Sequence, residues 1–206
     1  KSQNDKSTTL MNTLKSICVF CGSSEGNDPA ILEQAKVLGN QLAAHNITLV
    51  YGGSQLGIMG AVAKASLTQG GKGIGIIPEF LKTKEIVYTD LDEVITTQNM
   101  HERKLKMQEV SDGFITLPGG FGTFEELFEI ITWSQLGLHH KPIGLLNING
   151  FYDHLIAMLD EMVNRGFLSA KNRQLLIVDD EVDGLLDKMK HFTPDFTSKF
   201  LKPENT

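Results

Sequence analysis

The sequence predicts an α/β fold: a single-domain, doubly wound (Rossmann-like) parallel sheet flanked by helices on both faces. Short apolar runs alternate with segments of helical periodicity along the chain, as in sheets whose parallel strands are joined by helical crossovers. The runs are continuous, as in Ile-Cys-Val-Phe at 17–20 and Ile-Gly-Leu-Leu at 143–146, which indicates strands covered on both faces. The 206 residues, 41% of them hydrophobic, suffice for one full-sized core.

Each strand is expected where a short apolar run ends in turn residues, and each helix where apolar residues recur every three or four positions. In chain order, strands are expected at 16–21, 48–51, 73–77, 93–96, 113–117, 143–147 and 175–178, with the weakest pattern at 93–96. Helices are expected between and after them at 29–45, 58–69, 99–110, 123–136, 152–165 and 182–189. The domain then spans 14–192, with a disordered polar leader at 1–13 and a C-terminal tail at 193–206.

The composition and cysteine usage argue against several classes of protein. A formal net charge of −6 and a pI of about 5.5 leave no basic surface for nucleic acid. No apolar stretch approaches the ~20 residues that span a membrane, and the start lacks the apolar segment of a signal peptide. Cys18 and Cys21 would fall on opposite faces of a strand, so they are expected as buried free thiols in a reducing cytoplasm. Neither they nor the histidines have the spacing of a metal site.

Three glycine-bearing loops follow predicted strands. Gly22-Ser23-Ser24 follows the first strand, and Gly52-Gly53-Ser54 follows the second. The third loop reads Pro-Gly-Gly-Phe-Gly-Thr-Phe-Glu-Glu at 118–126 and leads into a helix. Glycines allow a close backbone approach, and the first amides of a helix attract anions. One such loop is consistent with an ordinary turn, but three at one sheet edge favour a phosphate-bearing small molecule.

The two acids at the end of the third loop have several interpretations. Thr123 and Glu126 have the spacing of a capping box, which would give Glu126 a structural role. Glu125 suits the first helical turn electrostatically. A helical wheel instead places Glu126 beside Ile130 and Trp133, on a second apolar face that would meet a ligand or another subunit. The sheet-facing side would carry Phe124, Leu127, Phe128 and Ile131.

The segment Met-His-Glu-Arg-Lys at 100–104 carries the second set of candidate residues. On a helix, Arg103 shares a face with Met100 and Met107. An arginine on an inward face needs an anionic partner. The partner is either a carboxylate in an ordinary ion pair, or a phosphate, a ribose or Glu126 in the site. Lys104 flanks this face as a second contact or as a solvated charge.

Together these segments resemble the Lonely Guy family of cytokinin riboside 5′-monophosphate phosphoribohydrolases, which are often mislabelled as lysine decarboxylases. The family signature Pro-Gly-Gly-x-Gly-Thr-x-x-Glu, preceded by a Met-x-x-Arg-Lys helix, is intact at 118–126 and 100–104. Segments 21–24, 51–53, 57–60 and 131–133 also look like the family, and the similarity runs from about 15 to 178.

The resemblance implies hydrolysis of the N-glycosidic bond of an adenosine 5′-monophosphate, releasing the base and ribose 5-phosphate without a cofactor. It implies catalytic places for Arg103 and Glu126 and a homodimer with active sites near the subunit interface, which the Ile130 and Trp133 face would supply. The candidate substrate- and phosphate-binding residues are Ser23, Gly52, Gly53, Met100, Arg103, Lys104, Gly119, Gly120, Gly122 and Thr123.

Three other functions are considered. A non-catalytic carrier of a nucleotide or of molybdenum cofactor would keep the glycine loops without needing Glu126 or Arg103. A dinucleotide-dependent oxidoreductase is disfavoured because no Gly-x-Gly-x-x-Gly follows the first strand and no acid ends the second. A pyridoxal-phosphate decarboxylase would need a Schiff-base lysine, for which Lys104 is a candidate only by default. The sequence leaves open whether the base is adenine or an N6-prenylated adenine.

Overall fold

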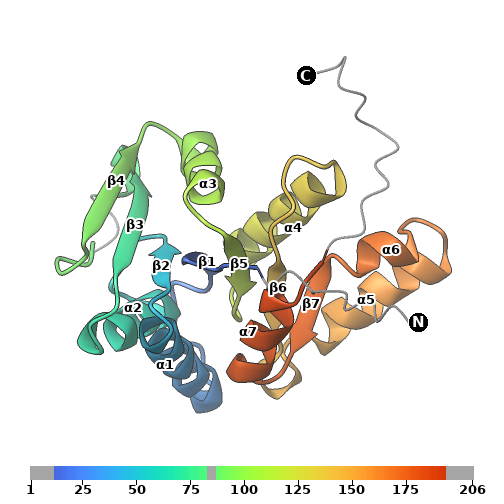
Figure 1. Cartoon of the computed structure of the whole chain (residues 1–206), viewed down its shortest axis with the longest axis horizontal. Coiled ribbons are helices and arrows are strands. Elements are labelled where there is room, and N and C mark those ends of the chain that lie inside the picture. The colour runs from blue at the N-terminus through green and yellow to red at the C-terminus, as the bar shows by residue number, and fades with distance from the viewer. Residues whose placement is uncertain (1–11, 83–86, 194–206) are drawn as a thin grey trace, which may run out of the picture.

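The computed structural model of the chain describes residues 12–82 and 87–193. Residues 1–11 of the expected leader and 194–206 of the expected tail lie outside the described residues. Within the described part, seven parallel strands form one sheet in the order β4-β3-β2-β1-β5-β6-β7 (Figure 1). The predicted doubly wound parallel sheet is confirmed.

The predicted strands and helices are present, with slightly shifted ends. The strands are β1 (Ser16–Phe20), β2 (Thr48–Tyr51), β3 (Gly73–Pro78), β4 (Glu93–Thr97), β5 (Gly113–Thr116), β6 (Ile143–Leu146) and β7 (Leu176–Asp179). The predicted helices are α1 (Pro29–Ala44), α2 (Gly57–Thr68), α3 (Met100–Glu109), α4 (Phe121–Gln135), α5 (Asp153–Asn164) and α7 (Val182–Lys190). Three short elements were not predicted: α6 (Ala170–Arg173) and the 3₁₀ turns η1 (Glu79–Leu81) and η2 (Ile148–Gly150). Elements of about one turn are too short to show a periodicity.

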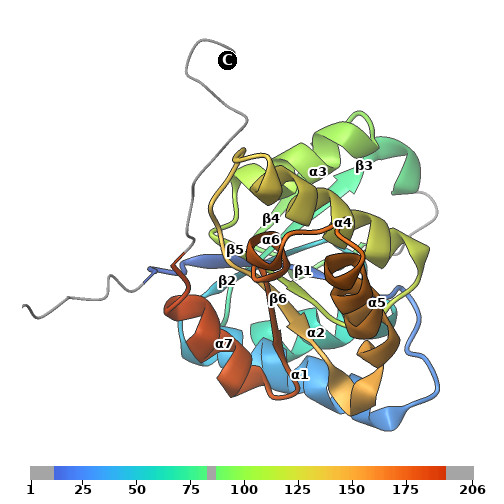
Figure 2. The ribbon, with the colours of Figure 1, turned by 90° about the vertical axis from the view of Figure 1, so that its right-hand side faces the viewer.

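Helices cover both faces of the sheet (Figures 1 and 2). One face packs against α1, α2 and α7, and the other against α3, α4 and α5. Successive residues of β1 serve opposite cores: Ile17 and Val19 belong to the first, and Cys18 and Phe20 to the second. This explains why the strand is apolar without alternation, since side chains point to alternate faces and both faces are buried.

The winding of the chain places a crevice beside β1. From β1 the strands proceed outward to β2, β3 and β4; the chain then returns to β5 and continues outward on the other side to β7. The direction of winding therefore reverses between β1 and β5, which are hydrogen-bonded neighbours. In sheets of this kind, ligands bind outside the carboxyl ends of the strands at such a reversal.

Among the described residues, no helix combines the length and the apolar character needed to cross a membrane.

Candidate active site

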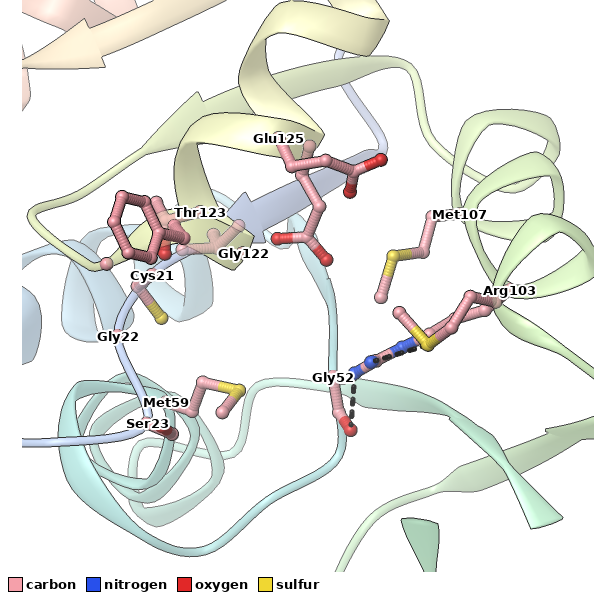
Figure 3. A pocket seen from close by; sticks show the side chains of 15 residues that line it. Cys21, Gly22, Ser23, Gly52, Met59, Arg103, Met107, Gly122, Thr123 and Glu125 are labelled. Atoms are coloured by element: carbon pink, nitrogen blue, oxygen red, sulfur yellow. Dashed lines mark hydrogen bonds between the residues drawn. The ribbon is translucent and has the colours of Figure 1, made fainter. Parts of the chain in front are cut away.

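A cavity of about 310 Å³ lies at the carboxyl ends of β1, β2 and β5, where the winding reverses (Figure 3). The loops after β1 and β5 form one side of it, and α3 forms the opposite side, from which Arg103 and Met107 point inward (Figure 3). Eight of the predicted site residues line the cavity: Ser23, Gly52, Met100, Arg103, Gly120, Gly122, Thr123 and Glu126. The edge of the sheet identified from the three glycine loops is thus where the structure forms a cavity.

The start of α4 rules out the capping-box interpretation of Glu126. The helix begins at Phe121, with Gly120 as its N-cap and no side-chain capping hydrogen bond. Thr123 is therefore the third residue of the helix and is only 4% exposed. Because the first amides of a helix have no partner within it, the turn from Gly120 to Thr123 offers N–H groups to the cavity. Glu126 lies in the next turn and is free to face the same cavity.

Two predicted glycine contacts do not line the cavity and have structural roles instead. A Cβ on Gly119 would collide with the Thr123 hydroxyl and approach the Gly22 nitrogen to 2.9 Å, so this glycine lets the β5–α4 turn pack against the β1 loop. Gly53 has a φ of +81°, a conformation that favours glycine, and its carbonyl accepts a hydrogen bond from Tyr88 N–H. Neighbouring Gly52 does line the cavity, and a Cβ there would collide with the Arg103 guanidinium.

Main-chain carbonyls at the ends of β2 and β3 hold Arg103 in place. Its side chain is buried, and Nε donates to the carbonyl oxygen of Ile76 at 2.9 Å. Nη2 donates to the carbonyl oxygen of Gly52 at 3.3 Å (Figure 3). Nη1 lies 3.9 Å from the sulfur of Met100. Among the described residues it forms no ion pair with a carboxylate, so the ordinary ion-pair interpretation is wrong. Arg103 is a fixed cation in the cavity wall.

The carboxyl of Glu126 titrates near neutrality. Burial in the cavity wall raises its pKa from the ordinary 4.5 to about 7; the positive charge of Arg103 opposes that shift, and Glu125 adds to it. A carboxyl in this range can hold or release a proton at physiological pH. Among the described residues, no group of three or more histidine, cysteine or acidic side chains is arranged to hold a metal ion.

Lys104, predicted as a possible substrate contact, is not among the residues that line the cavity. Its ammonium group lies 2.5 Å from Glu125 Oε1 and 2.8 Å from Glu129 Oε2. Arg103 and Lys104 are adjacent in sequence, but on a helix adjacent side chains point about 100° apart. One therefore reaches the strands and the cavity, whereas the other reaches α4.

Matches to known proteins establish the family to which the chain belongs. Residues 59–189 match the family model described as "Possible lysine decarboxylase". The chain is 46% identical over 193 residues to cytokinin riboside 5′-monophosphate phosphoribohydrolase LOG2 of Arabidopsis thaliana, covering 92% of this chain and 91% of LOG2. The chain belongs to the cytokinin riboside 5′-monophosphate phosphoribohydrolase (LOG) family.

Other matches agree with this family and its fold. LOG4 of Arabidopsis thaliana is 46% identical over 178 residues, which cover 86% of this chain and 83% of LOG4. Among solved structures, the molybdenum cofactor carrier protein of Chlamydomonas reinhardtii superposes with a TM-score of 0.65 at 23% identity, covering 86% of this chain and 96% of the carrier. The molybdenum cofactor binding protein of Rippkaea orientalis has the same TM-score of 0.65, identity of 23% and coverages of 86% and 96%. At these identities the structural matches show the fold alone.

Seven residues that line the cavity of this LOG-family chain were not among the predicted site residues. They are Val19, Cys21, Gly22, Met59, Met107, Phe121 and Glu125. Most belong to motifs already visible in the sequence; Met107, for example, shares a helix face with Met100 and Arg103, and this shared face was the signal that it also reaches the site. Burial raises the pKa of the Cys21 thiol well above its ordinary range, which keeps it protonated and unreactive.

The predicted second apolar face of α4 in this LOG-family chain is an inner face. Ile130 is only 3% exposed and belongs to the core with Leu127, and Trp133 packs against that core. Phe128, which was expected to face the sheet, is instead 37% exposed, and Phe121 is 98% exposed. Residues of both predicted faces, such as Leu127 and Ile130, thus pack on one core. A wheel gives the angles between side chains, but it cannot show where the sheet lies around the helix.

Proposed function

We propose that the protein hydrolyses the N-glycosidic bond of an adenosine 5′-monophosphate, plain or N6-modified, and releases the base and ribose 5-phosphate. The names of its relatives, cytokinin riboside 5′-monophosphate phosphoribohydrolases, support this substrate class. The observation that carries the proposal is that one cavity unites the uncapped start of α4, the near-neutral carboxyl of Glu126 and the fixed cation Arg103. These are the groups that such a reaction requires.

The start of α4 is the proposed phosphate site. Gly120 and Gly122 carry no side chain to obstruct the approach of an anion, and nothing lies within 4 Å of a Cβ built on either. The Thr123 hydroxyl and the loop after β1 with Ser23 complete this end of the cavity. Helix N-termini attract phosphate through unpaired N–H groups and the helix dipole. Phosphate held here fixes the ribose and lends binding energy to a bond broken elsewhere in the cavity.

Glu126 is the proposed catalytic carboxylate, with Arg103 as the cation that orients the ligand. As the bond between C1′ and the base nitrogen breaks, its electron pair leaves with the base and positive charge develops on the ribose. The Glu126 carboxylate stabilises that charge or takes the proton of the water that adds to C1′. The departing base gains a proton, and Arg103 supports the negative charge that builds up before the proton arrives.

A pyridoxal-phosphate decarboxylase is not supported, despite the description of the matching family model. Burial alone would lower the pKa of Lys104, but the hydrogen bonds that its ammonium group donates to Glu125 and Glu129, together with the charges of these two acids, outweigh burial and raise it. An ammonium held in two ion pairs is a poor candidate for a Schiff base, which needs a neutral amine.

The proposal includes a homodimer in a reducing, cytoplasmic setting. An apolar edge lies beside the site. It consists of Phe121, which is exposed at the mouth of the cavity, and Phe128, which is exposed about two helical turns further along α4. This edge replaces Ile130 and Trp133 as the proposed subunit contact. The two described cysteines, Cys18 and Cys21, are free and buried, which fits a reducing compartment. Light scattering should give twice the chain mass, and F128E should return the monomer mass.

Chromatography of reaction products tests the proposed function. Adenosine 5′-monophosphate and its N6-isopentenyl derivative should each be converted to free base and ribose 5-phosphate, whereas the unphosphorylated ribosides should react far more slowly. The carrier alternative shares the fold of the structural neighbours. Tight binding of the nucleotide without release of base would favour that alternative and contradict the hydrolase.

A further inference from the structure

Lys104 joins α3 to α4 through a two-carboxylate ion pair. Its ammonium group lies 2.5 Å from Glu125 and 2.8 Å from Glu129, and its side chain is only 9% exposed. The two acids are four residues apart and so occupy successive turns of α4. In contrast, the neighbouring pair Lys106–Glu109 stays within α3, at 3.4 Å, with both side chains at least 40% exposed. The bridge differs from that pair at its lysine end, since Lys104 is shielded although Glu125 is 53% exposed and Glu129 26% exposed. It also connects two helices, so it restrains their relative position, which a pair within one helix does not.

This bridge lies one residue away from both proposed catalytic groups. Lys104 follows Arg103 on α3, and Glu125 precedes Glu126 on α4. Arg103 donates hydrogen bonds to the main-chain carbonyls of Ile76 and Gly52. These bonds fix the position of α3 relative to the sheet. The bridge then locates the first turns of α4, and with them Glu126, relative to α3.

We propose that Lys104 is a positioning residue, which holds Glu126 opposite Arg103 by binding Glu125 and Glu129 and balances the charge around the Glu126 carboxyl. The proposal rests on the proposed function, since it assigns a role to Lys104 within the same reaction. It differs from a phosphate or ribose contact because the ammonium group is already paired and does not line the cavity. Lys104 then acts on the substrate only through Glu126.

The charges around Glu126 make the two halves of the bridge distinguishable. The ionisable groups that face it are Arg103 and Lys104 from α3, Glu125 and Glu129 from α4, the thiol of Cys18 from β1 and the thiol of Cys21 from the loop after β1. Lys104 lowers the pKa of Glu126, and Glu129 raises it. Removing either partner breaks the same ion pair, yet removing the cation should raise the pKa of Glu126 and removing the anion should lower it.

The test compares K104M, E129Q and the double variant with K106M, which breaks the exposed pair on α3 and serves as the matched control. Rates of base release from adenosine 5′-monophosphate are measured from pH 5 to pH 9. K104M should lower kcat about tenfold at pH 7, because a small misplacement of a catalytic group costs this much or more, with KM changed less than about threefold. The acid side of the pH–rate profile should move to higher pH in K104M and to lower pH in E129Q. The profile of K106M should match that of the wild type. K104R, which can still bind both acids, should restore most of kcat.

Three outcomes would overturn the proposal. One is a K104M whose KM rises more than about tenfold with an unmoved acid limb, as expected of a phosphate contact. Another is a shift of the limb in the same direction in K104M and E129Q. The third is a double variant whose losses simply multiply, since paired residues should show coupling.

A direct measurement separates this proposal from the proposed function. The pKa of Glu126 can be followed by ¹³C NMR of labelled glutamate carboxyls, assigned with E126Q, in variants shown to be folded by thermal melting. If the wild type releases no base, the proposed function fails while the opposite pKa shifts still test the bridge. If base is released but the pKa of Glu126 is the same in K104M, E129Q and wild type, the positioning role alone fails.

Discussion

The two helices that flank the cavity begin in opposite ways. At the start of α3, Asn99 accepts a hydrogen bond from Glu102 N–H at 2.9 Å, and Glu102 accepts one from Gln98 N–H at 2.8 Å. At the start of α4, Gly120 provides no such bond. Both helices have an acid near the start, but only α4 leaves its amides to the cavity. We call a helix start sealed when side chains cap its amides, as in α3, and open when they do not, as in α4. A sealed start is structural, whereas an open start beside a cavity is available to a ligand.

The largest expected effect is on the rate of base release, which should depend on the acid near the start of α4 and not on the acid at the start of α3. E126Q should lower the rate of base release by roughly 10²–10³-fold, because the neutral amide cannot stabilise positive charge on the ribose. E102Q, which changes the acid of the sealed start, should keep the rate within about twofold. Product chromatography under single-turnover conditions measures both. Retention of the full rate by E126Q would remove the proposed role of Glu126.

The second effect concerns the stability of the folded protein. The pKa of Glu126 is raised in the folded state from 4.5 to about 7, so folding favours its protonated form. The stability that this group contributes is complete below pH 4.5 and is lost as the pH rises through 7. E126Q, which mimics the protonated form, should therefore become more stable than the wild type between pH 5 and pH 8, by on the order of 2 kcal/mol.

Urea unfolding of both proteins at pH 5 and pH 8 provides the measurement. E102Q, which changes the acid at the start of α3, is measured under the same conditions for comparison. An E126Q that keeps the same stability relative to the wild type at both pH values would argue against a raised pKa at Glu126.

A third effect probes the open start of α4 as a phosphate site. T123V keeps the shape of the buried side chain but removes its hydroxyl, which should lower kcat/KM for adenosine 5′-monophosphate about tenfold, as for a lost hydrogen bond to a charged group. The residual activity on unphosphorylated adenosine should not change, because that substrate has no phosphate for the Thr123 hydroxyl to bind. Equal losses on both substrates would show that Thr123 acts elsewhere than on the phosphate.

The smallest effect tests the sealed start of α3. N99A removes the cap and should lower the free energy of unfolding by about 1 kcal/mol, measured by urea denaturation. KM should remain within about twofold, because Asn99 does not line the cavity. A large rise in KM without loss of stability would mean that this helix start also serves the ligand.

The strands and the parallel sheet were predictable from the sequence for physical reasons. Runs such as Ile17–Phe20 are apolar at every position because both faces of β1 are covered. Such a run therefore indicates, from local sequence alone, a strand that is buried on both faces. Arg103 and Glu126 were singled out because each falls on an apolar face of its helix, and the family resemblance then implied catalytic places for both, which stay a prediction. The exact start of α4 was not predictable, since Thr123 with Glu126 forms a plausible capping box whether or not the chain uses it.

The sequence by itself determined the alternation of elements, the glycine loops at one sheet edge and the family signature, because these depend on neighbours in the chain. Only the tertiary structure decided that Ile130 is buried, that Gly119 and Gly53 serve the backbone, and that Lys104 binds α4. A helical wheel gives the angle between two side chains on one helix. It does not say what lies opposite each of them, and that depends on how α3 and α4 pack on the sheet.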